Sequence, residues 1–557
     1  MTPRHRITAF VLLLVFVAAL LRIGLAVRPG LWVDEVFSLA MATGHSLEHP
    51  AAEANPELGD YVEPSEPLPA STWRKYAEHE NPLAGVDRVV RAVLLSDTSP
   101  PLYYVLLNLW TRVAGTSDAA LRLFSTLWAL LCFPLLWVLG REIGGRRAAW
   151  ATCIFYAFSP VALYYATEGR MYSLLWFLGL LLIWSSLLLT RRGPHPRLLV
   201  LWIASAAAGL LSHYFFAFVW LAALCWLALY PGRLPRLHLA AATMVVGLLI
   251  LPWYLLLPES LGRWRVTAGW LDYPLTLKQA LTAPFLLAWS FLSGSGIWGG
   301  SKWDNQLAAL LYALLILLVL RRGVRPLLSE RRRLFWLWLF AAVLGVLAFD
   351  LLRGTNASLM ARYALPGLPA AMLLAGLGIS RLPRRTQAPF LLGILLCWTP
   401  GLADIFRWPP RMWQPFPEVA ERLTAWTRPG DVIIVHSIPS GVLGVARYQD
   451  SPAPLASWVP QLGQRDSASD MAALTAGRCR VALVKIHDLG EPSPAELWLR
   501  EHATLAGEHR LHSDPVTEIL YFLPAPAGRS ATRCPAWNTP APTAPGTPAP
   551  PAPHTAG

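Results

Sequence analysis

Two adjacent carboxylates, Asp34 and Glu35, follow the first long apolar run of the chain after a short stretch of loop residues. A carboxylate at a membrane surface can take a proton from a hydroxyl nucleophile, and partial loss of water makes it a better base. The same position also suits ordinary solvated loop charges. The pair therefore contains a candidate catalytic base, Asp34, and a candidate substrate-binding carboxylate, Glu35.

Further charged residues occur where the chain has almost no loop. Asp97 precedes a double proline, and both Glu168 and Arg170 stand between two apolar runs. Asp97 also suits a helix cap, and Glu168 with Arg170 suits a structural ion pair. Charges held so close to hydrocarbon are costly and are commonly kept for function. These three residues are therefore candidates for substrate binding.

His213 and Arg362 complete the set of candidates. His213 lies at the junction of two apolar runs, where a lone histidine is most often an ordinary hydrogen-bonding residue. Arg362 opens another apolar run, and its planar guanidinium can bind two phosphate oxygens at once. Carboxylates and guanidiniums at a lipid surface suit a reaction between a lipid-borne phosphate leaving group and a hydroxyl acceptor.

The elements that must position these residues are membrane helices. Hydrophobic residues make up 55% of the 557 residues and charged residues only 15%, which excludes a soluble protein with a charged surface. A span needs ~20 apolar residues to cross a core of ~30 Å. The runs that reach or approach this length are residues 7–27, 119–139, 148–165, 171–189, 198–211, 214–230, 239–257, 307–320, 334–352, 363–378 and 389–402. The shorter run 102–114 is predicted to be interfacial or re-entrant, and the fold class is an α-helical polytopic membrane protein with about 11–13 spans.

Basic clusters between the runs predict the orientation. If all of them are cytoplasmic, the N-terminus is cytoplasmic and two short tilted spans meet near His213. The loops 28–100 and 258–305, every candidate residue and the C-terminal region then lie on the outer face. The basic residues that give the net charge of +13 thus serve to orient the helices in the membrane, and nucleic acid is not expected as a partner. We expect an inner (plasma) membrane protein whose C-terminal domain is periplasmic.

The pattern changes after the last apolar run. Residues 410–525 are predicted to form a small α/β extramembrane domain. Its expected helix and strands are residues 418–427, 431–436, 480–486 and 519–523. Residues 526–557 are rich in Pro, Ala and Thr and are predicted to be disordered. The remaining domain is the membrane part, residues 1–405, which includes the outer loop 28–100.

Several short motifs resemble the multi-span glycosyltransferases of the GT-C class, family 39 type, which are similar to protein O-mannosyltransferases and lipid A aminoarabinose transferases. The resemblance covers most of residues 5–405 and extends into the C-terminal domain. The motifs are residues 31–35 (LWVDE), 99–104 (SPPLYY), 120–125 (ALRLFS), 168–172 (EGRMY), 212–214 (SHY), 361–366 (ARYALP), 417–420 (PEVA) and 428–431 (RPGD).

The resemblance implies transfer of a sugar from a polyprenyl-phosphate donor on the outer face, by an inverting displacement. Asp34 would be the base or the acceptor-binding carboxylate, with Glu35 supporting it. Glu168, Arg170 and Arg362 would bind the donor phosphate or the acceptor. The acceptor is an envelope lipid, a glycan or a protein hydroxyl, and the lipid bilayer is the remaining partner.

Some relatives hold a divalent metal ion through outer carboxylates. The resemblance therefore makes Asp34, Asp97 and Glu168 candidate ligands of a possible divalent metal ion, although no His or Cys ligand spacing accompanies them. The motif also departs from the family, because Thr98 and Ser99 precede the prolines where many relatives have a histidine. Fold and donor class thus carry over better than substrate identity.

Other functions stay open. One is a ligase or polymerase of lipid-linked oligosaccharides. Another is a transporter or flippase, which would show inverted repeats and polar residues in mid-span, and a third is a scaffold without activity. Here the ionisable residues gather at one face, which favours surface chemistry. Cys479 and Cys534 lie outside the apolar runs and can pair only in an oxidising compartment.

Overall fold

The computed structural model of the chain forms two compact units. It describes residues 3–97, 99–267, 269–293, 302–321, 325–406, 414–465, 467–487, 492–511, 513 and 516–524. The helical unit comprises Met1–Pro29, Phe37–Ser46 and His79–Pro410. The α/β unit comprises Gly30–Val36, Leu47–Glu78 and Arg411–Gly557. The predicted disordered tail and Cys534 lie outside the described residues.

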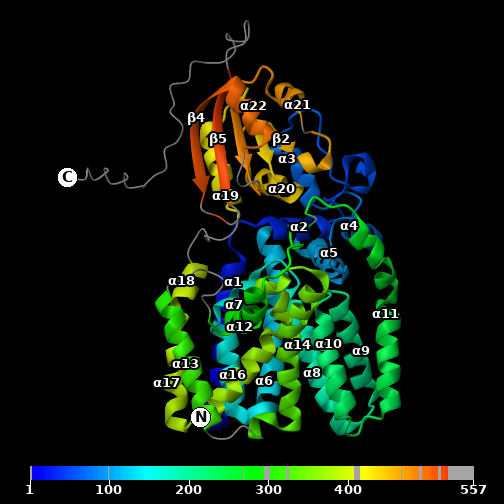
Figure 1. Cartoon of the computed structure of the whole chain (residues 1–557), viewed down its shortest axis with the longest axis vertical. Helices are drawn as coiled ribbons and strands as arrows, with labels where there is room; N and C mark the ends of the chain where they lie inside the picture. The colour runs from blue at the N-terminus through cyan, green and yellow to red at the C-terminus, as the bar shows by residue number, and fades with distance from the viewer. Residues whose placement is uncertain are drawn as a thin grey trace, which may run out of the picture. The chain divides into compact units, whose positions relative to one another are not determined.

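The helical unit is built from helices of very different length, most of them apolar (Figure 1). They are α1 (Pro3–Ala26), α4 (Val86–Ser96), α5 (Leu102–Ala114), α6 (Asp118–Phe158), α7 (Pro160–Thr167), α8 (Tyr172–Arg192), α9 (Pro196–Leu210), α10 (Phe216–Leu229), α11 (Arg236–Gly262), α12 (Leu277–Ser293), α13 (Lys302–Leu320), α14 (Glu330–Arg353), α15 (Ala361–Ala364), α16 (Leu368–Arg381), α17 (Arg384–Cys397) and α18 (Thr399–Phe406). Among the described residues, 5 helices are long and apolar enough to cross a membrane, or 6 if the bent pair α17–α18 is one span. The predicted polytopic α-helical fold is confirmed.

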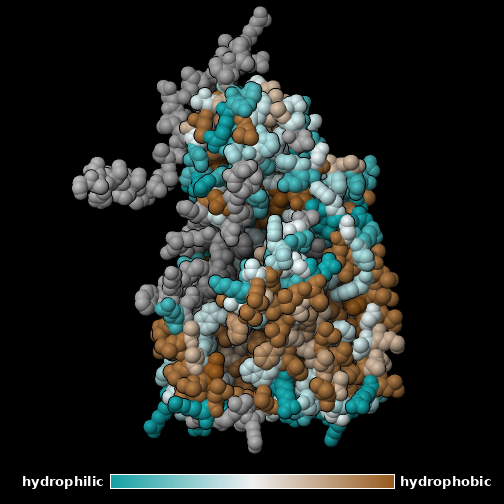
Figure 2. All heavy atoms as spheres, in the orientation of Figure 1, coloured by the Kyte–Doolittle hydropathy of each residue, from teal (hydrophilic) through white to brown (hydrophobic). Residues whose placement is uncertain are grey.

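The surface of this unit is apolar where a soluble protein would be polar. Figure 2 shows hydrophobic atoms gathered over its helices. Leu248 and Leu255 of α11 and Leu310 of α13 are each more than half exposed. Exposed apolar surface of this extent is rare in soluble monomers, and lipid chains solvate it without cost.

Helix breaks fall close to where the sequence predicts them. In α6 the backbone leaves the helical conformation at Gly145, with φ of 78°, so two helices meet there as the runs 119–139 and 148–165 predict. Two short helices also flank His213. The second run ends early, because Ser159 caps a new helix and Pro160 occupies its first turn.

Several helices were not predicted from the sequence, and α12 is the longest of them. α12 lies within residues 258–305, which we expected to be a loop. Its buried residues Ala283, Leu287 and Phe291 recur every fourth position, while Phe285 is exposed. The run is apolar but contains Pro284, and proline usually ends or kinks a helix, so the pattern does not mark one continuous helix.

The α/β unit contains a five-stranded sheet in the order β2-β1-β3-β5-β4. β1 pairs in parallel with β2 and β3, while β5 is antiparallel to both β3 and β4. Its strands and main helices are α19 (Phe416–Trp426), β1 (Val432–His436), α20 (Pro439–Tyr448), β2 (Leu455–Trp458), α21 (Ala468–Thr475), β3 (Val481–Lys485), α22 (Pro494–His502), β4 (Ala503–Leu511) and β5 (Thr517–Pro524). The predicted helix and the three predicted strands are present, whereas β2 and β4 were missed.

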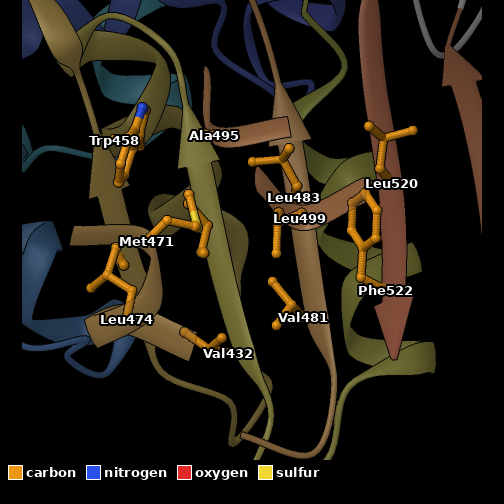
Figure 3. Packing of buried hydrophobic residues seen from close by; sticks show 12 residues of the cluster. Val432, Trp458, Met471, Leu474, Val481, Leu483, Ala495, Leu499, Leu520 and Phe522 are labelled. Carbon is orange, nitrogen blue, oxygen red and sulfur yellow. The ribbon is translucent and has the colours of Figure 1, made fainter. Parts of the chain in front are cut away.

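Helices cover both faces of this sheet. On one face, Met471 of α21 and Leu499 of α22 pack into the core that Leu483 and Phe522 line (Figure 3). On the other face, the ring of Trp426 in α19 lies 4.6 Å from that of Tyr521. Strands covered on both faces read as continuous apolar runs, which is why β1 and β3 could be recognised from the sequence.

Part of the long loop 28–100 belongs to the α/β unit. Leu68 forms a β-bridge with Leu455, with N–O distances of 3.0 and 2.7 Å in the two directions, and so covers the free edge of β2. Arg74, in α3 (Ala70–Arg74), donates to the carbonyl oxygens of Ala446 and Gln449 at 3.2 and 2.8 Å and so satisfies the C-terminal end of α20. The loop is thus a structural element of this unit.

Candidate functional site

A tyrosine hydroxyl joins two of the predicted site residues in the helical unit. Tyr104, fully buried in the first turn of α5, donates a hydrogen bond to a carboxylate oxygen of Asp97. Nη1 of Arg170 donates to the Tyr104 hydroxyl and to Oγ of Ser38, each at 3.1 Å. The double proline starts α5 directly after Asp97, and the break between α7 and α8 supplies Arg170. We call Asp97, Tyr104 and Arg170 the bridged cluster.

Asp97 orders the turn before α5 but does not cap this helix, because the N-cap residue is Pro101 and no side chain caps it. Its Oδ1 accepts a hydrogen bond from the backbone N–H of Ser99 at 3.0 Å, which orders the turn into α5. Its other carboxylate oxygen belongs to the bridged cluster. Arg265, which the sequence analysis missed, donates to the carbonyl oxygen of Asp97 at 3.1 Å and to Oγ of Ser260 at 2.9 Å. No spacing signal singles out this arginine, because it lies in an irregular segment after α11.

His213 lies within electrostatic reach of three other predicted residues. Burial, followed by the charge of Arg170, lowers the pKa of His213 to about 4; Arg362 acts in the same direction and Asp97 opposes them. The imidazole is therefore neutral at neutral pH. Its Nδ1 accepts from the backbone N–H of Phe215 at 3.1 Å, which leaves the proton on Nε2. His213 can donate a hydrogen bond here without adding a charge.

Arg362 is held by aromatic rings and by an ordered turn. Its guanidinium lies 5.1 Å from the ring centroid of Trp270 and 5.3 Å from that of Tyr363. The turn before it is fixed by Asp350, whose carboxylate accepts the backbone N–H groups of Ala357 at 2.9 Å and Ser358 at 2.6 Å. Cation–π contacts and a fixed backbone orient the guanidinium before a ligand binds.

Glu168 belongs to the same region of the helical unit. Its side chain is buried, and Tyr172 lies within electrostatic reach of Glu168, Arg362 and Arg170. A tight turn joins the two charged residues, since the N–H of Arg170 donates to the carbonyl oxygen of Glu168 at 2.7 Å. The structure therefore brings together all five predicted residues of the helical unit.

Asp34 and Glu35 belong to the α/β unit and stand in the first turn of α2 (Val33–Ala42). Glu35 is fully buried, and its Oε2 accepts the backbone N–H of Trp32 at 3.3 Å. Acidic residues in this position are stabilised by the N-terminal end of the helix. Asp34 is partly exposed. Glu35 thus helps to form the helix start, and Asp34 is the more accessible carboxylate.

The three carboxylates named as possible metal ligands are divided between the two units, with Asp34 in the α/β unit and Asp97 and Glu168 in the helical unit. Among the residues that the structure describes, no group of three or more His, Cys, Asp and Glu side chains could hold a metal ion. No chemical step is derived through a metal ion.

Comparisons with known proteins show similarity in family and in fold. The family model for dolichyl-phosphate-mannose-protein mannosyltransferases matches residues 98–255, the segment that contains Tyr104, Arg170 and His213. The structure of ArnT from Cupriavidus metallidurans bound to undecaprenyl phosphate is similar, with a TM-score of 0.50, 16% identity, and coverage of 92% of this chain and 98% of that chain. The fold is that of the GT-C glycosyltransferases. The predicted resemblance to this class is confirmed.

Other structures with the GT-C fold are also similar. The apo form of the same ArnT has a TM-score of 0.49 and 15% identity, and covers 88% of this chain and 97% of that chain. The oligosaccharyltransferase AglB from Archaeoglobus fulgidus has a TM-score of 0.46 and 13% identity, with coverage of 85% and 69%. A comparison with curated protein sequences finds no match. At such identities a shared GT-C fold leaves the substrate open.

Proposed function

We propose that this protein is a membrane glycosyltransferase that moves a sugar from a polyprenyl-phosphate donor to a hydroxyl group of an envelope lipid, glycan or protein. The reaction takes place on the outer face of the inner membrane. The bridged cluster carries the proposal, because hydrogen bonds fix a partly exposed guanidinium close to a buried carboxylate, and because Tyr104 and Arg170 lie inside the segment that the mannosyltransferase family model matches. Buried charge of this kind is costly and is kept for a purpose.

The donor phosphate would be held by Arg170 and Arg362. Both guanidiniums are partly exposed, and both are oriented by neighbouring side chains. Two cations stabilise a phosphate leaving group more than one, since charge develops on its oxygens as the bond to the sugar breaks. Neutral His213 would add a hydrogen bond donor without a further charge.

In the proposed step, Asp34 accepts the proton of the acceptor hydroxyl as its oxygen attacks the anomeric carbon. The bond between that carbon and the phosphate oxygen breaks, and polyprenyl phosphate leaves with the bonding electron pair. Attack from the face opposite the leaving group inverts the configuration. The products are the glycosylated acceptor and polyprenyl phosphate, with the proton on Asp34.

The proposed outer location has one chemical support in the α/β unit. Cys479, which precedes β3 by two residues, is disulfide-bonded. Structural disulfides persist in oxidising compartments such as the periplasm and are rare in the cytosol. The unit that carries Asp34 would therefore work outside the cytoplasm.

Replacing Asp34 by asparagine tests the assignment of the base. Membranes that contain the Asp34→Asn protein are assayed for transfer from radiolabelled polyprenyl-phosphate sugars, and we expect a rate at least ~100-fold below that of the wild type. Glu57→Gln, which neutralises an exposed acid of the same loop, is the matched control and should retain full activity. Transfer by Asp34→Asn at the wild-type rate would refute the role of Asp34.

A further inference from the structure

The carboxyl end of the sheet in the α/β unit lies next to the segment that carries Asp34. β1 continues through α20 to β2 on one side, while β3 lies on its other side. In open α/β sheets this strand order, 2-1-3, places ligand sites at the carboxyl ends of the strands on either side of the switch in direction. Ser437 follows β1 at this end, and His487 follows β3.

Three hydrogen bonds connect these strand ends to the backbone before Asp34. The N–H of Val33 donates to Oε1 of Gln414 at 3.3 Å, and Nε2 of Gln414 lies 3.4 Å from Nε2 of His487. Nδ1 of His487 lies 3.1 Å from Oγ of Ser437. The N–H of Leu31 also donates to the hydroxyl of Tyr448, the last residue of α20, at 2.7 Å. Residues 31–33 are therefore held at two backbone positions.

The bonding pattern fixes the state of the imidazole. Because Oε1 of Gln414 accepts from Val33, its Nε2 must be the group that faces His487, and an amide N–H can only donate. His487 thus accepts through Nε2, carries its proton on Nδ1 and donates to Ser437. Burial lowers the pKa of His487 to about 4, and the nearby charge of Asp34 opposes this shift. The chain of hydrogen bonds is complete only while the imidazole is neutral.

Two backbone features suit this arrangement. His487 has a φ of 66°, in the left-handed region that few non-glycine residues adopt, so its side chain is placed by an unusual turn after β3. Gly441 leaves space for the contact, since a Cβ atom at that position would lie 2.0 Å from Oγ of Ser437. The unusual backbone of His487 and the absence of a side chain at Gly441 thus both permit the hydrogen bond between His487 and Ser437.

We propose that His487 is a positioning residue for Asp34. In this proposal the carboxyl end of the sheet binds residues 31–33 and so fixes the position of the catalytic carboxylate that follows them. The proposal rests on the proposed function of Asp34. The α/β unit is then part of the catalytic apparatus, and residues that follow β1 and β3 take the place that a ligand has in other open α/β sheets. Loss of the hydrogen bonds that hold residues 31–33 would lower kcat, while Arg170 and Arg362 of the helical unit would still be able to bind the donor phosphate.

The first experiment measures the geometry without relying on activity. Hydrogen exchange of the peptide covering residues 30–36 is followed in the full-length wild type and in His487→Ala and Gln414→Ala. We expect the amide of Val33 to exchange at least ~10-fold faster in both variants, because Gln414→Ala removes its acceptor and His487→Ala removes the side chain that orients this acceptor. Exposed His502 supplies the control variant His502→Ala, which should leave this exchange unchanged. Exchange in His487→Ala at the wild-type rate would overturn the proposal.

The second experiment separates positioning from folding. Steady-state transfer from a radiolabelled polyprenyl-phosphate sugar should show a kcat ~10- to 100-fold lower in His487→Ala, with KM for the donor within about twofold of the wild type. His487→Gln, whose Oε1 can accept from Gln414, should recover most of kcat. A wild-type kcat in His487→Ala contradicts the positioning role. If the wild type transfers no sugar, the proposed function fails, while the exchange data still decide whether the sheet holds the segment.

Discussion

Tyr104 is the residue on which the bridged cluster depends, since its hydroxyl accepts from Arg170 and donates to Asp97. Tyr104→Phe removes this hydroxyl and keeps the ring in its buried position. We expect kcat/KM for transfer to fall ~10- to 100-fold, because a partly exposed guanidinium and a buried carboxylate each lose a hydrogen-bond partner. The exposed Tyr273 gives the control Tyr273→Phe, which should have wild-type kinetics. Equal kcat/KM in the two variants would show that the cluster has no part in the reaction.

Residue types and their location beside apolar runs drew attention to Asp97, Glu168 and Arg170, which the structure places in one region of the helical unit, while their role in catalysis stays a prediction. A charge between two spans stands out against hydrocarbon, so each was visible in the sequence. Tyr104 and Arg265 were not recognised as site residues, because tyrosine is common at membrane interfaces and Arg265 lies in an irregular segment. Their contribution comes from hydrogen bonds between elements distant in the chain, and no local pattern encodes such contacts.

At the scale of elements, the long loop 28–100 joins the sheet through a buried carboxylate. Oε1 of Glu63 accepts from Oγ of Ser457 at 2.6 Å and from the N–H of Val459 at 3.0 Å. Burial raises the pKa of Glu63 to about 7, although Ser457 and Arg465 act in the opposite direction. The loop therefore packs on β2 with a carboxyl group that gains its proton near neutral pH.

Because the pKa of Glu63 is higher in the folded state than its ordinary value of 4.5, the folded state binds more protons between these two values. The docking of the loop should be strongest below pH 4.5 and weaken as the pH rises to about 7, by up to about 1.4 kcal/mol per pH unit. Hydrogen exchange of the peptide containing Leu68, corrected for intrinsic rates, measures this dependence in the full-length protein.

Glu63→Gln should remove the pH dependence, and Glu66→Gln, at an exposed site of the same loop, should retain it. A protection factor for Leu68 that stays constant between pH 5 and pH 8 in the wild type would contradict this account of the loop.

Elements with a strong apolar pattern were predictable, and those with a mixed pattern were not. β1 and β3 are buried on both faces and were recognised as continuous apolar runs. β4 alternates between half-buried and exposed residues, and β2 has only four residues, so neither forms such a run. The attachment of residues 47–78 to the sheet follows from the bridge at Leu68 and from Glu63, which are contacts across several hundred residues.

At the scale of the whole molecule, the basic clusters predict which side of the membrane each loop occupies. An alkaline phosphatase fusion after Ala525 should be enzymatically active, because that reporter folds only where disulfides form. A fusion after Arg192, at the end of α8, should be inactive since the basic cluster there is predicted to be cytoplasmic. The reverse pattern would place the α/β unit and Asp34 in the cytoplasm and would contradict the proposed outer reaction.

The central claim is that the chain consumes a polyprenyl-phosphate sugar with the help of Arg170. The most direct measurement incubates the purified protein in lipid vesicles with polyprenyl phosphates bearing radiolabelled mannose, glucose, galactose, arabinose or aminoarabinose, together with an extract of envelope acceptors. We predict that the wild type releases polyprenyl phosphate from at least one donor in step with label transfer, and that Arg170→Ala does so ~100-fold more slowly. Release at the same rate by wild type and Arg170→Ala, or by neither, would contradict the account.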